Sequence, residues 1–298
     1  MKLGIVLSVL ASLLFAVLYY FVTYLEPLSG ESVFAWRVLL GLPALMLLNA
    51  RNRGWSDIER TAGRMRREPT LLLLMALAAA LIGVQLWLFV WAPLHQRALD
   101  VTLGYFLLPI FMVAVGRFFY GERLSRLQSV AVVIASIGVA NEIWRLQALS
   151  WVTAIVVIGY PPYFMLRRAL RMRSLTTLWF DLLFLVPPAL FILASQSESV
   201  WSQFAGRPAL FALVPMLGVL SSLALVCYLS AAKLLPLALF GLLGYVEPIL
   251  LFIVAFLFLG EPVSSQAWYT YVPIWIAMAF LAADGVRSWH GQRQRVRA

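Results

Sequence analysis

The sequence predicts an all-α integral membrane protein with ten transmembrane helices, arranged as two inverted five-helix repeats. Three observations lead to this fold class. Hydrophobic residues make up 63% of the 298 residues and charged residues only 12%, about half the charged share of a soluble domain. Apolar runs of about 20 residues recur along the whole chain. The loops between them alternate between rich and poor in basic residues.

Ten apolar segments are long enough to cross a bilayer, and each is expected to be helical because lipid offers backbone groups no outside partner. The first exceeds the 7–15-residue core of a signal peptide, so we expect a retained span. Only residues 51–69 form a long connection, so neighbouring helices should be antiparallel. The ten spans are expected near 3–24, 31–50, 70–92, 99–119, 126–143, 150–166, 175–194, 209–231, 236–259 and 266–286.

The distribution of lysine and arginine predicts the orientation of these spans. One set of alternate loops and ends holds 19 of the 23 basic residues, and the opposite set holds 3. Because cytoplasmic loops are enriched in Lys and Arg, both termini are expected in the cytoplasm, which also requires an even number of spans. The remaining basic residue, Arg37, lies inside the second span.

A repeat is visible in the spacing of proline and Gly-Glu pairs. Pro109 lies 12 residues before Gly121-Glu122, and Pro248 lies 12 residues before Gly260-Glu261, an offset of 139. Two halves, 1–145 and 146–298, therefore hold five spans each. Because five is odd, the second half should be inverted relative to the first, as in many secondary transporters. The glutamates of the two Gly-Glu pairs are expected in loop turns, since glycine often ends a helix.

The motifs that form this repeat also carry a family resemblance. The stretches "LGYFLLPIFMVAVGRFFYGERLSRLQ" at 103–128, "WLFVWA" at 87–92 and the second "GE" resemble the EamA-type drug/metabolite transporters, and among them the RarD-like proteins. The resemblance covers essentially the whole chain. It implies a ten-helix protein of the bacterial inner (plasma) membrane with two EamA repeats and a central cavity, which exports small metabolites or drugs.

Three charged residues inside spans are candidate binding residues, because charges in a membrane usually face protein or water and mark a function. Glu247 lies beside Pro248, which removes one backbone donor and is expected to kink the helix, as is Pro109 in the first half. This carboxylate is a candidate site for a proton or cation. Arg37 and Asp181 occupy corresponding places in the two halves. Each is expected either to line the cavity or to hold the packing, and Arg37 could instead snorkel to the outer interface.

Four aromatic residues complete the expected binding site. Trp87 and Trp91 lie one turn apart on the third span, Tyr105 lies one turn before Pro109, and Tyr163 follows a Pro-Pro pair in the sixth span. Aromatic walls suit planar, amphipathic or cationic substrates. The alternative for each is ordinary packing against lipid or another helix.

The sequence lacks the motifs of an enzyme, and no cofactor or metal is expected. It has no G-x-x-x-x-G-K-[ST] loop for ATP, no H-E-x-x-H zinc pattern and no G-x-S-x-G elbow. The lone Cys227 behaves as a small apolar residue. No nucleic-acid partner is expected despite the net charge of +10, because the basic residues sit in loops between apolar spans.

These observations favour a secondary transporter that works by alternating access on a small-molecule substrate, within membrane lipid and with protons as the candidate coupling ion. The alternative is a non-transporting membrane scaffold, sensor or lipid-scrambling component. That alternative predicts a tightly packed interior around Pro109 and Pro248, whereas a transporter requires a polar cavity.

Overall fold

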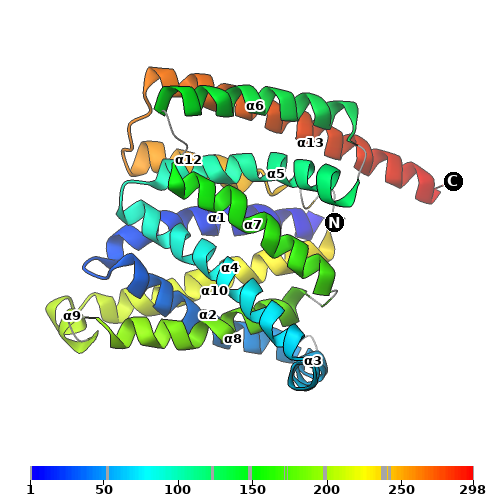
Figure 1. The fold of residues 1–298 in the computed structure, drawn as a ribbon. Coiled ribbons are helices and arrows are strands. Elements are labelled where there is room, and N and C mark those ends of the chain that lie inside the picture. The colour runs from blue at the N-terminus through cyan, green and yellow to red at the C-terminus, as the bar shows by residue number, and fades with distance from the viewer. Residues whose placement is uncertain are drawn as a thin grey trace. The chain divides into compact units, whose positions relative to one another are not determined.

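Every regular element that the structure describes is helical, as the ribbon in Figure 1 shows. The structure is a computed structural model and describes residues 2–51, 54–121, 124–146, 150–170, 172, 174–196, 200–235, 240 and 243–297. The expected all-α class is confirmed for these ranges.

Each of the ten expected segments holds a helix. Within the described ranges, five of these helices are long and apolar enough to cross a membrane, and a sixth qualifies if the bent α5 counts as one span. The helices are α1 (Lys2–Phe21), α2 (Gly30–Arg51), α4 (Pro69–Leu94), α5 (Ala98–Tyr120), α6 (Arg126–Leu146), α7 (Trp151–Leu170), α8 (Ser174–Ala194), α10 (Leu210–Leu234), α12 (Val246–Ile253) and α13 (Trp268–Arg297).

Several short elements lie outside the expected segments or extend them. The long connection between the second and third expected spans contains α3 (Trp55–Arg67), and the loop before α10 contains α9 (Val200–Gly206). The 3-10 turns are η1 (Val22–Leu25) and η3 (Ser265–Ala267). A π-helical turn, η2 (Val254–Phe258), continues α12.

The chain forms two compact units. Unit 1 consists of Met1–Ala16, Gln96–Pro161 and Cys227–Ala298, and unit 2 consists of Val17–His95 and Pro162–Val226. Each unit therefore takes residues from both expected repeats. The repeats were predicted from similar sequence patterns, whereas the units are defined by which residues pack together. The division into units therefore does not test the predicted halves 1–145 and 146–298.

Unit 1 is built around α6 and α13, which pack along each other and lie side by side in Figure 1. The helices α5 and α12 add to this pair, and the shared core is apolar and aromatic. Phe252 of α12 packs against Phe106 of α5 and Trp275 of α13, with ring centroids 6.3 and 5.2 Å apart. Other buried members are Leu103, Leu107, Ile110, Tyr271, Ile274 and Met278.

Polar side chains fix the start of α6 against α13. The backbone N–H of Ser125 donates to Gln128 Oε1 at 3.0 Å and that of Gln128 donates to Ser125 Oγ at 3.1 Å, which is a capping box. Asp284 of α13 accepts from both side chains, from Ser125 Oγ at 2.6 Å and from Gln128 Nε2 at 2.9 Å. One carboxylate thus holds the cap of another helix.

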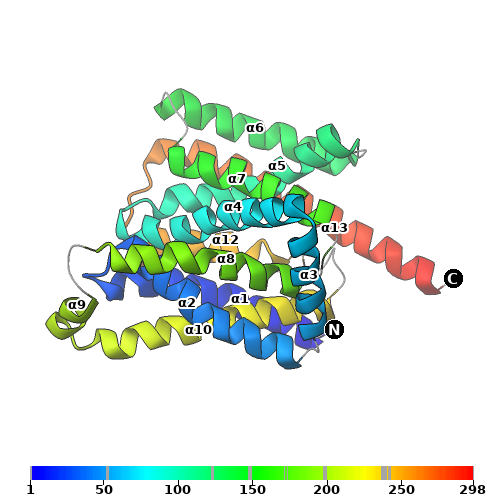
Figure 2. The ribbon, with the colours of Figure 1, turned by 60° about the horizontal axis from the view of Figure 1, so that its bottom comes forward.

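Unit 2 is built around α2, α4 and α8, which pack on one another and run together in Figure 2. The short α3 crosses the end of this group, where α4 begins. Its Ile58 is buried with Leu71 and Met75 of α4 and with Phe180 of α8. Because α3 has an apolar face that these residues cover, the long connection folds back onto the bundle.

Both glycines of the Gly-Glu pairs have the left-handed backbone conformation. Gly121 has φ +64° and ends α5, where its N–H donates to the carbonyl of Gly116. Gly260 has φ +68° and follows η2. Most side chains are strained at such angles, so glycine is favoured at both positions. Glu122 itself lies outside the described residues.

Candidate functional site

A buried carboxylate, Asp181 in α8, is the centre of a polar cluster in unit 2. Its side chain is only 1% exposed. Its Oδ2 accepts hydrogen bonds from the hydroxyl of Tyr163 at 3.0 Å and from Nη1 of Arg167 at 3.3 Å. Arg167 is itself 16% exposed, so the two charges form a largely buried ion pair. Charged residues within membrane helices usually pair in this way and usually mark a functional site.

The helical period explains why α7 supplies both partners of Asp181. Tyr163 and Arg167 are four residues apart and therefore lie on the same face of α7. The Arg167 guanidinium lies over the Tyr163 ring at 5.4 Å from its centroid. This stacking orients the guanidinium, which adds a cation–π attraction to the ion pair. The sequence predicts Tyr163 and Asp181 as site residues, whereas Arg167 directly follows the expected sixth span, 150–166, and is predicted to lie in a loop, although its spacing from Tyr163 was a usable signal.

The two oxygens of Asp181 differ in their hydrogen bonding. Oδ1 is buried and has no hydrogen-bond partner in the described part of the chain, while Oδ2 has two. Leaving a buried acceptor unsatisfied costs about 1–3 kcal/mol. The open oxygen can bind a proton or accept a hydrogen bond from a ligand N–H. Asp181 is the eighth residue of α8, about 10 Å along the helix from its start at 1.5 Å per residue.

The predicted tryptophan pair lies together on α4. The rings of Trp87 and Trp91 are 5.4 Å apart between centroids, and Trp91 stacks on His95 at 4.0 Å. Nε1 of Trp87 donates to the carboxylate of Glu31 in α2 at 3.3 Å. The backbone of Gly30 also lies against Trp91, where a Cβ at Gly30 would come within 2.9 Å of the Trp91 Cα. Glu31 is thus a polar neighbour that the sequence analysis missed.

Arg37 has an aromatic neighbour in the same unit. Its guanidinium lies over the Phe89 ring, 5.0 Å from the ring centroid. The Tyr19 and Phe89 rings are also in contact, with their centroids 4.9 Å apart. The Arg37 side chain is half-buried. Arg37 therefore lies over an aromatic pair, an arrangement that stabilises a cation in an apolar setting.

Unit 1 holds the remaining predicted residues. The hydroxyls of Tyr105 in α5 and Tyr160 in α7 are hydrogen-bonded at 2.8 Å. Glu247 is half-buried and lies close enough to Tyr228 to interact with it electrostatically. Tyr105 and Glu247 belong to unit 1 and the others to unit 2, so a site that joins all of them stays a prediction.

The two predicted kinks differ in the structure. α5 bends by 43° between Ala98–Leu108 and Ile110–Tyr120, and the side chain of Pro109, the predicted kink between these segments, lies outside the described residues. Pro248, by contrast, is the third residue of α12, which begins only at Val246. A proline in the first turn removes no helical hydrogen bond and produces no kink there. Glu247 accordingly lies in a first turn, where the helix dipole favours a negative charge, and not midway along a long helix.

The interior of unit 1 beside these prolines is closely packed. Phe106, Leu107 and Ile110 of α5 are buried, as are Leu251 and Phe252 of α12. All but Leu251 belong to the apolar core of unit 1, and the central polar cavity stays a prediction.

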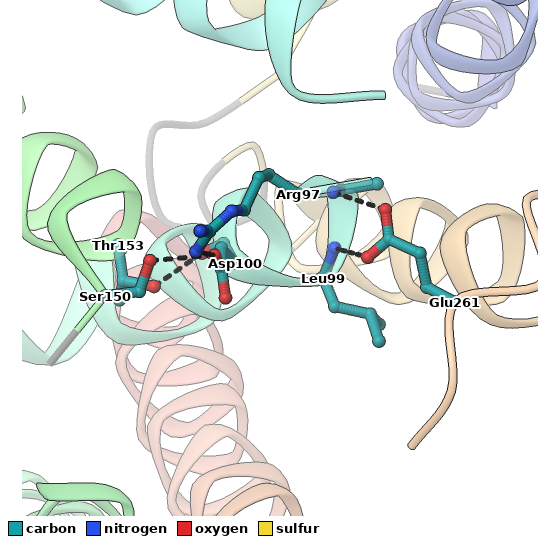
Figure 3. Close-up of polar contacts among 7 residues, drawn as sticks. Arg97, Leu99, Asp100, Ser150, Thr153 and Glu261 are labelled. Carbon is teal, nitrogen blue, oxygen red and sulfur yellow. Dashed lines mark hydrogen bonds and ion pairs between the residues drawn. The ribbon is translucent and has the colours of Figure 1, made fainter. Parts of the chain in front are cut away.

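A second polar cluster surrounds the start of α5 in unit 1 (Figure 3). The carboxylate of Glu261 accepts the backbone N–H groups of Ala98 at 2.6 Å and Leu99 at 2.8 Å. Asp100 Oδ2 accepts from Arg97 Nη1 at 3.1 Å and from the hydroxyl of Ser150 at 2.8 Å.

The backbone at Asp100 joins the same cluster. The hydroxyl of Thr153, in the first turn of α7, donates to the carbonyl of Asp100 at 2.8 Å. Glu261, the glutamate of the second Gly-Glu pair, was expected only in a loop turn. Its carboxylate also caps the start of α5 through the amides of Ala98 and Leu99.

An open pocket of about 390 Å³ lies in unit 2 between the loop after η1 and α9. Arg207 Nη1 donates to the backbone carbonyl of Glu26 at its edge. None of the predicted site residues lines this pocket. Its lining residues are Glu26, Pro27, Ser202, Gln203, Gly206 and Arg207. Within the described ranges, no three metal-ligating side chains gather at one place.

Comparisons with known proteins place this chain among membrane transporters. Residues 2–141 match the EamA-like transporter family. The chloramphenicol-sensitive protein RarD of Pseudomonas aeruginosa is 44% identical, over 98% of this chain and 97% of its own. An uncharacterized transporter of Haemophilus influenzae is 38% identical, over 98% and 96%. Protein RarD of Escherichia coli is 27% identical, over 95% of each.

One solved crystal structure of another protein has a similar fold, with a TM-score of 0.53 over 93% of this chain and 96% of that one. Its sequence is 18% identical, so the likeness concerns the fold alone. The full-length similarity to RarD proteins, the apolar helices and the family match agree with one another. The chain therefore belongs to the EamA-like transporter family, among its RarD-like membrane transporters of the bacterial inner membrane.

Proposed function

We propose that this chain is a secondary transporter that exports a small metabolite or drug by alternating access and couples export to protons. The buried carboxylate Asp181 is the observation that carries the proposal. Its Oδ2 is held by Tyr163 and Arg167, while its Oδ1 has no partner in the parts of the chain described above. A charge kept inside an apolar helix at a cost in stability is retained where it serves a function.

The Asp181 cluster provides a simple coupling mechanism. A proton that binds Oδ1 cancels the negative charge and removes the Coulomb attraction that holds Arg167. The Arg167 guanidinium is then free to move away from Asp181. Loss of the proton restores the ion pair. Protonation would thereby change the packing between α7 and α8, and such a two-state contact can open one side of a transporter while closing the other.

The repeat supplies the symmetry that alternating access needs. We propose ten membrane spans in two inverted repeats, 1–145 and 146–298, with both termini in the cytoplasm. The helix in each of the ten segments and the matching left-handed glycines Gly121 and Gly260 support this arrangement. In such a protein Arg37, Trp87, Trp91, Tyr105, Tyr163 and Glu247 would line the substrate cavity with Asp181.

Transport in proteoliposomes tests the proposal. The full chain is reconstituted with an imposed pH gradient, and solutes are screened for movement. Chloramphenicol is the first solute, because a relative is named for sensitivity to it. We expect proton-driven movement of at least one solute. Asp181→Asn should abolish the response to the pH gradient, whereas solute exchange at equal pH should persist.

Two further variants make the result specific. Asp57→Asn removes a half-buried carboxylate that pairs with Arg60 on α3, and it should leave transport unchanged. Glu247→Gln tests the other carboxylate predicted inside a span. If Glu247→Gln loses the pH response while Asp181→Asn keeps it, Asp181 is not the coupling residue. If no solute in a broad panel moves through the wild-type protein, the transport proposal itself fails.

A further inference from the structure

The helix α3 has two chemically distinct faces. Ile58, Ala62 and Met65 follow a helical spacing of four and three residues and pack on the starts of α4 and α8. The rest of the helix surface carries four exposed arginines, which we name the α3 arginine face: Arg60, Arg64, Arg66 and Arg67. Because α4 and α8 cover the apolar side, the exposed basic side is the part of α3 that could attract anionic lipid, as basic residues next to a membrane span do.

The four arginines are not equally available. Arg60 pairs with Asp57 at 2.9 Å and Arg64 with Glu68 at 3.3 Å, both within the helix or at its end. Arg66 and Arg67 have no ion-pair partner among the residues whose placement is described. The last turn of α3 therefore presents two uncompensated charges.

The position of Arg66 and Arg67 in the chain indicates their depth in the membrane. α4 begins at Pro69, directly after α3, and is an apolar helix of 26 residues that is long enough to cross a membrane. Arg66 and Arg67 thus lie two to three residues before the chain enters the hydrocarbon, where lipid phosphates are found. At the other end of α3, Trp55 is 38% exposed, and tryptophan is enriched in this interfacial layer.

We propose that α3 lies in the headgroup layer of the membrane and binds anionic phospholipids through Arg66 and Arg67. Guanidinium groups bind phosphate oxygens with two parallel hydrogen bonds, and each basic residue next to a span strengthens the association with anionic lipid by about fivefold. The inference is independent of what the protein transports. It depends only on α3, α4 and α8 of unit 2.

Lipid selectivity at α3 is the direct test. The full chain is reconstituted in phosphatidylcholine vesicles with a fluorophore attached through Ser56→Cys, an exposed position on α3. Brominated phosphatidylglycerol or brominated phosphatidylcholine is then added as a quencher. We expect an association constant at least fivefold higher for the phosphatidylglycerol. Arg66→Gln combined with Arg67→Gln should remove this preference.

Matched controls separate lipid binding from damage to the fold. Arg60→Gln alters a guanidinium already paired with Asp57 and should change the preference less than twofold. Quenching by the phosphatidylcholine should stay the same in all variants if α3 keeps its place. If the double variant does not fold, 0.5 M NaCl added to the wild type replaces it, because salt screens exposed charges and should weaken the preference.

Three outcomes would overturn the proposal. Equal quenching by both lipids would show that the arginines do not select anionic headgroups. A preference that survives the double variant, or high salt, would place its source elsewhere. An absence of quenching by either lipid would place α3 away from the bilayer, as expected if an acidic protein partner covers it.

Discussion

The cap that Glu261 forms on α5 gives the sharpest stability prediction. Glu261 is buried, and its two oxygens accept the N–H groups of Ala98 and Leu99 (Figure 3). The residue at the usual capping position, Arg97, has no side-chain acceptor and makes no capping hydrogen bond to a backbone amide of α5. Glu261→Ala therefore leaves two amides at the start of α5 without their acceptors.

The expected loss follows from these two hydrogen bonds. A buried amide that loses its acceptor costs about 1–3 kcal/mol, and a lost helix cap costs about 0.5–2 kcal/mol. Ala98 is fully buried and Leu99 is half-buried. We therefore expect Glu261→Ala to lower the free energy of unfolding by about 2–4 kcal/mol. At about 2 °C per kcal/mol for a chain of this size, Tm falls by roughly 4–8 °C.

This stability should also depend on pH. Burial raises the pKa of the Glu261 carboxyl above its ordinary value of 4.5, and the hydrogen bonds from Leu99 and Ala98 offset only part of that rise. Because the folded pKa lies above the unfolded one, the protonated group favours folding, and it can still accept hydrogen bonds. Its contribution is complete below about pH 4 and declines as the pH rises through the folded pKa. The difference between the wild type and Glu261→Ala should therefore shrink from pH 4 to pH 7.

Thermal unfolding in detergent and amide hydrogen exchange measure these effects. Exchange should accelerate selectively in peptides that cover the first turn of α5. Glu68→Ala is the matched control, because Glu68 is exposed and its pair with Arg64 should contribute less than about 1 kcal/mol. A Tm for Glu261→Ala equal to that of the control would refute the capping argument. A difference that grows as the pH rises would refute the linkage argument.

Three further substitutions test packing and helix capping. Gly104→Ala should destabilise the protein by about 1–3 kcal/mol, because the new Cβ would lie 2.6 Å from the Cβ of Val156. Gly63→Ala on α3 should instead stabilise it by about 0.5–1 kcal/mol, because a Cβ there meets nothing within 4 Å. Thermal unfolding of the two variants in parallel checks the opposite signs. Asp284→Ala should lower the free energy of unfolding by about 1–3 kcal/mol, because it removes the acceptor of the Ser125 and Gln128 side chains. Amide hydrogen exchange at the start of α6 should become faster in this variant. Unchanged protection there would contradict the role of Asp284.

The positions of the long helices could be predicted from the sequence because one physical requirement dominates them. A span must be apolar and about 20 residues long, and both properties are visible in a linear pattern. α2, α4, α8 and α10 accordingly begin and end within a few residues of the expected segments. The helix α3 was missed because it is short and half polar. Its signal, apolar residues at 58, 62 and 65, was present in the connection between two spans.

The ninth expected span shows where the pattern fails. In the apolar run from 236 to 259, the structure has a turn at Gly244 and Tyr245. The sequence pattern alone indicated a kink at Pro248 and no turn before it. The backbone turn before Val246 moves Glu247 into a first turn. Residues 236–239, 241 and 242 lie outside the described part of this segment. Hydropathy therefore locates the apolar run but not the start of its helix.

The partners of the candidate residues were harder to predict than the residues themselves. Asp181 was identified because a carboxylate in an apolar run is rare, but its partner Arg167 lies in a group of basic residues that orientation alone explains. Glu31 was passed over because it lies at the start of α2, where an acidic residue is common. Side chains that reach from a helix end into a neighbouring helix have no signal in one-dimensional patterns, because the pairing depends on which helices pack together.

The repeat and the packing units carry different information, and Glu261 shows how they are connected. The offset of 139 residues relates Glu261 to Glu122, yet Glu261 binds the start of α5, which belongs to the other half of the sequence. Unit 1 likewise combines α5 and α6 from the first half with α12 and α13 from the second. An isolated half would lack these contacts. Each half therefore completes its helix caps and its core with residues of the other, so neither half alone should be a stable fold.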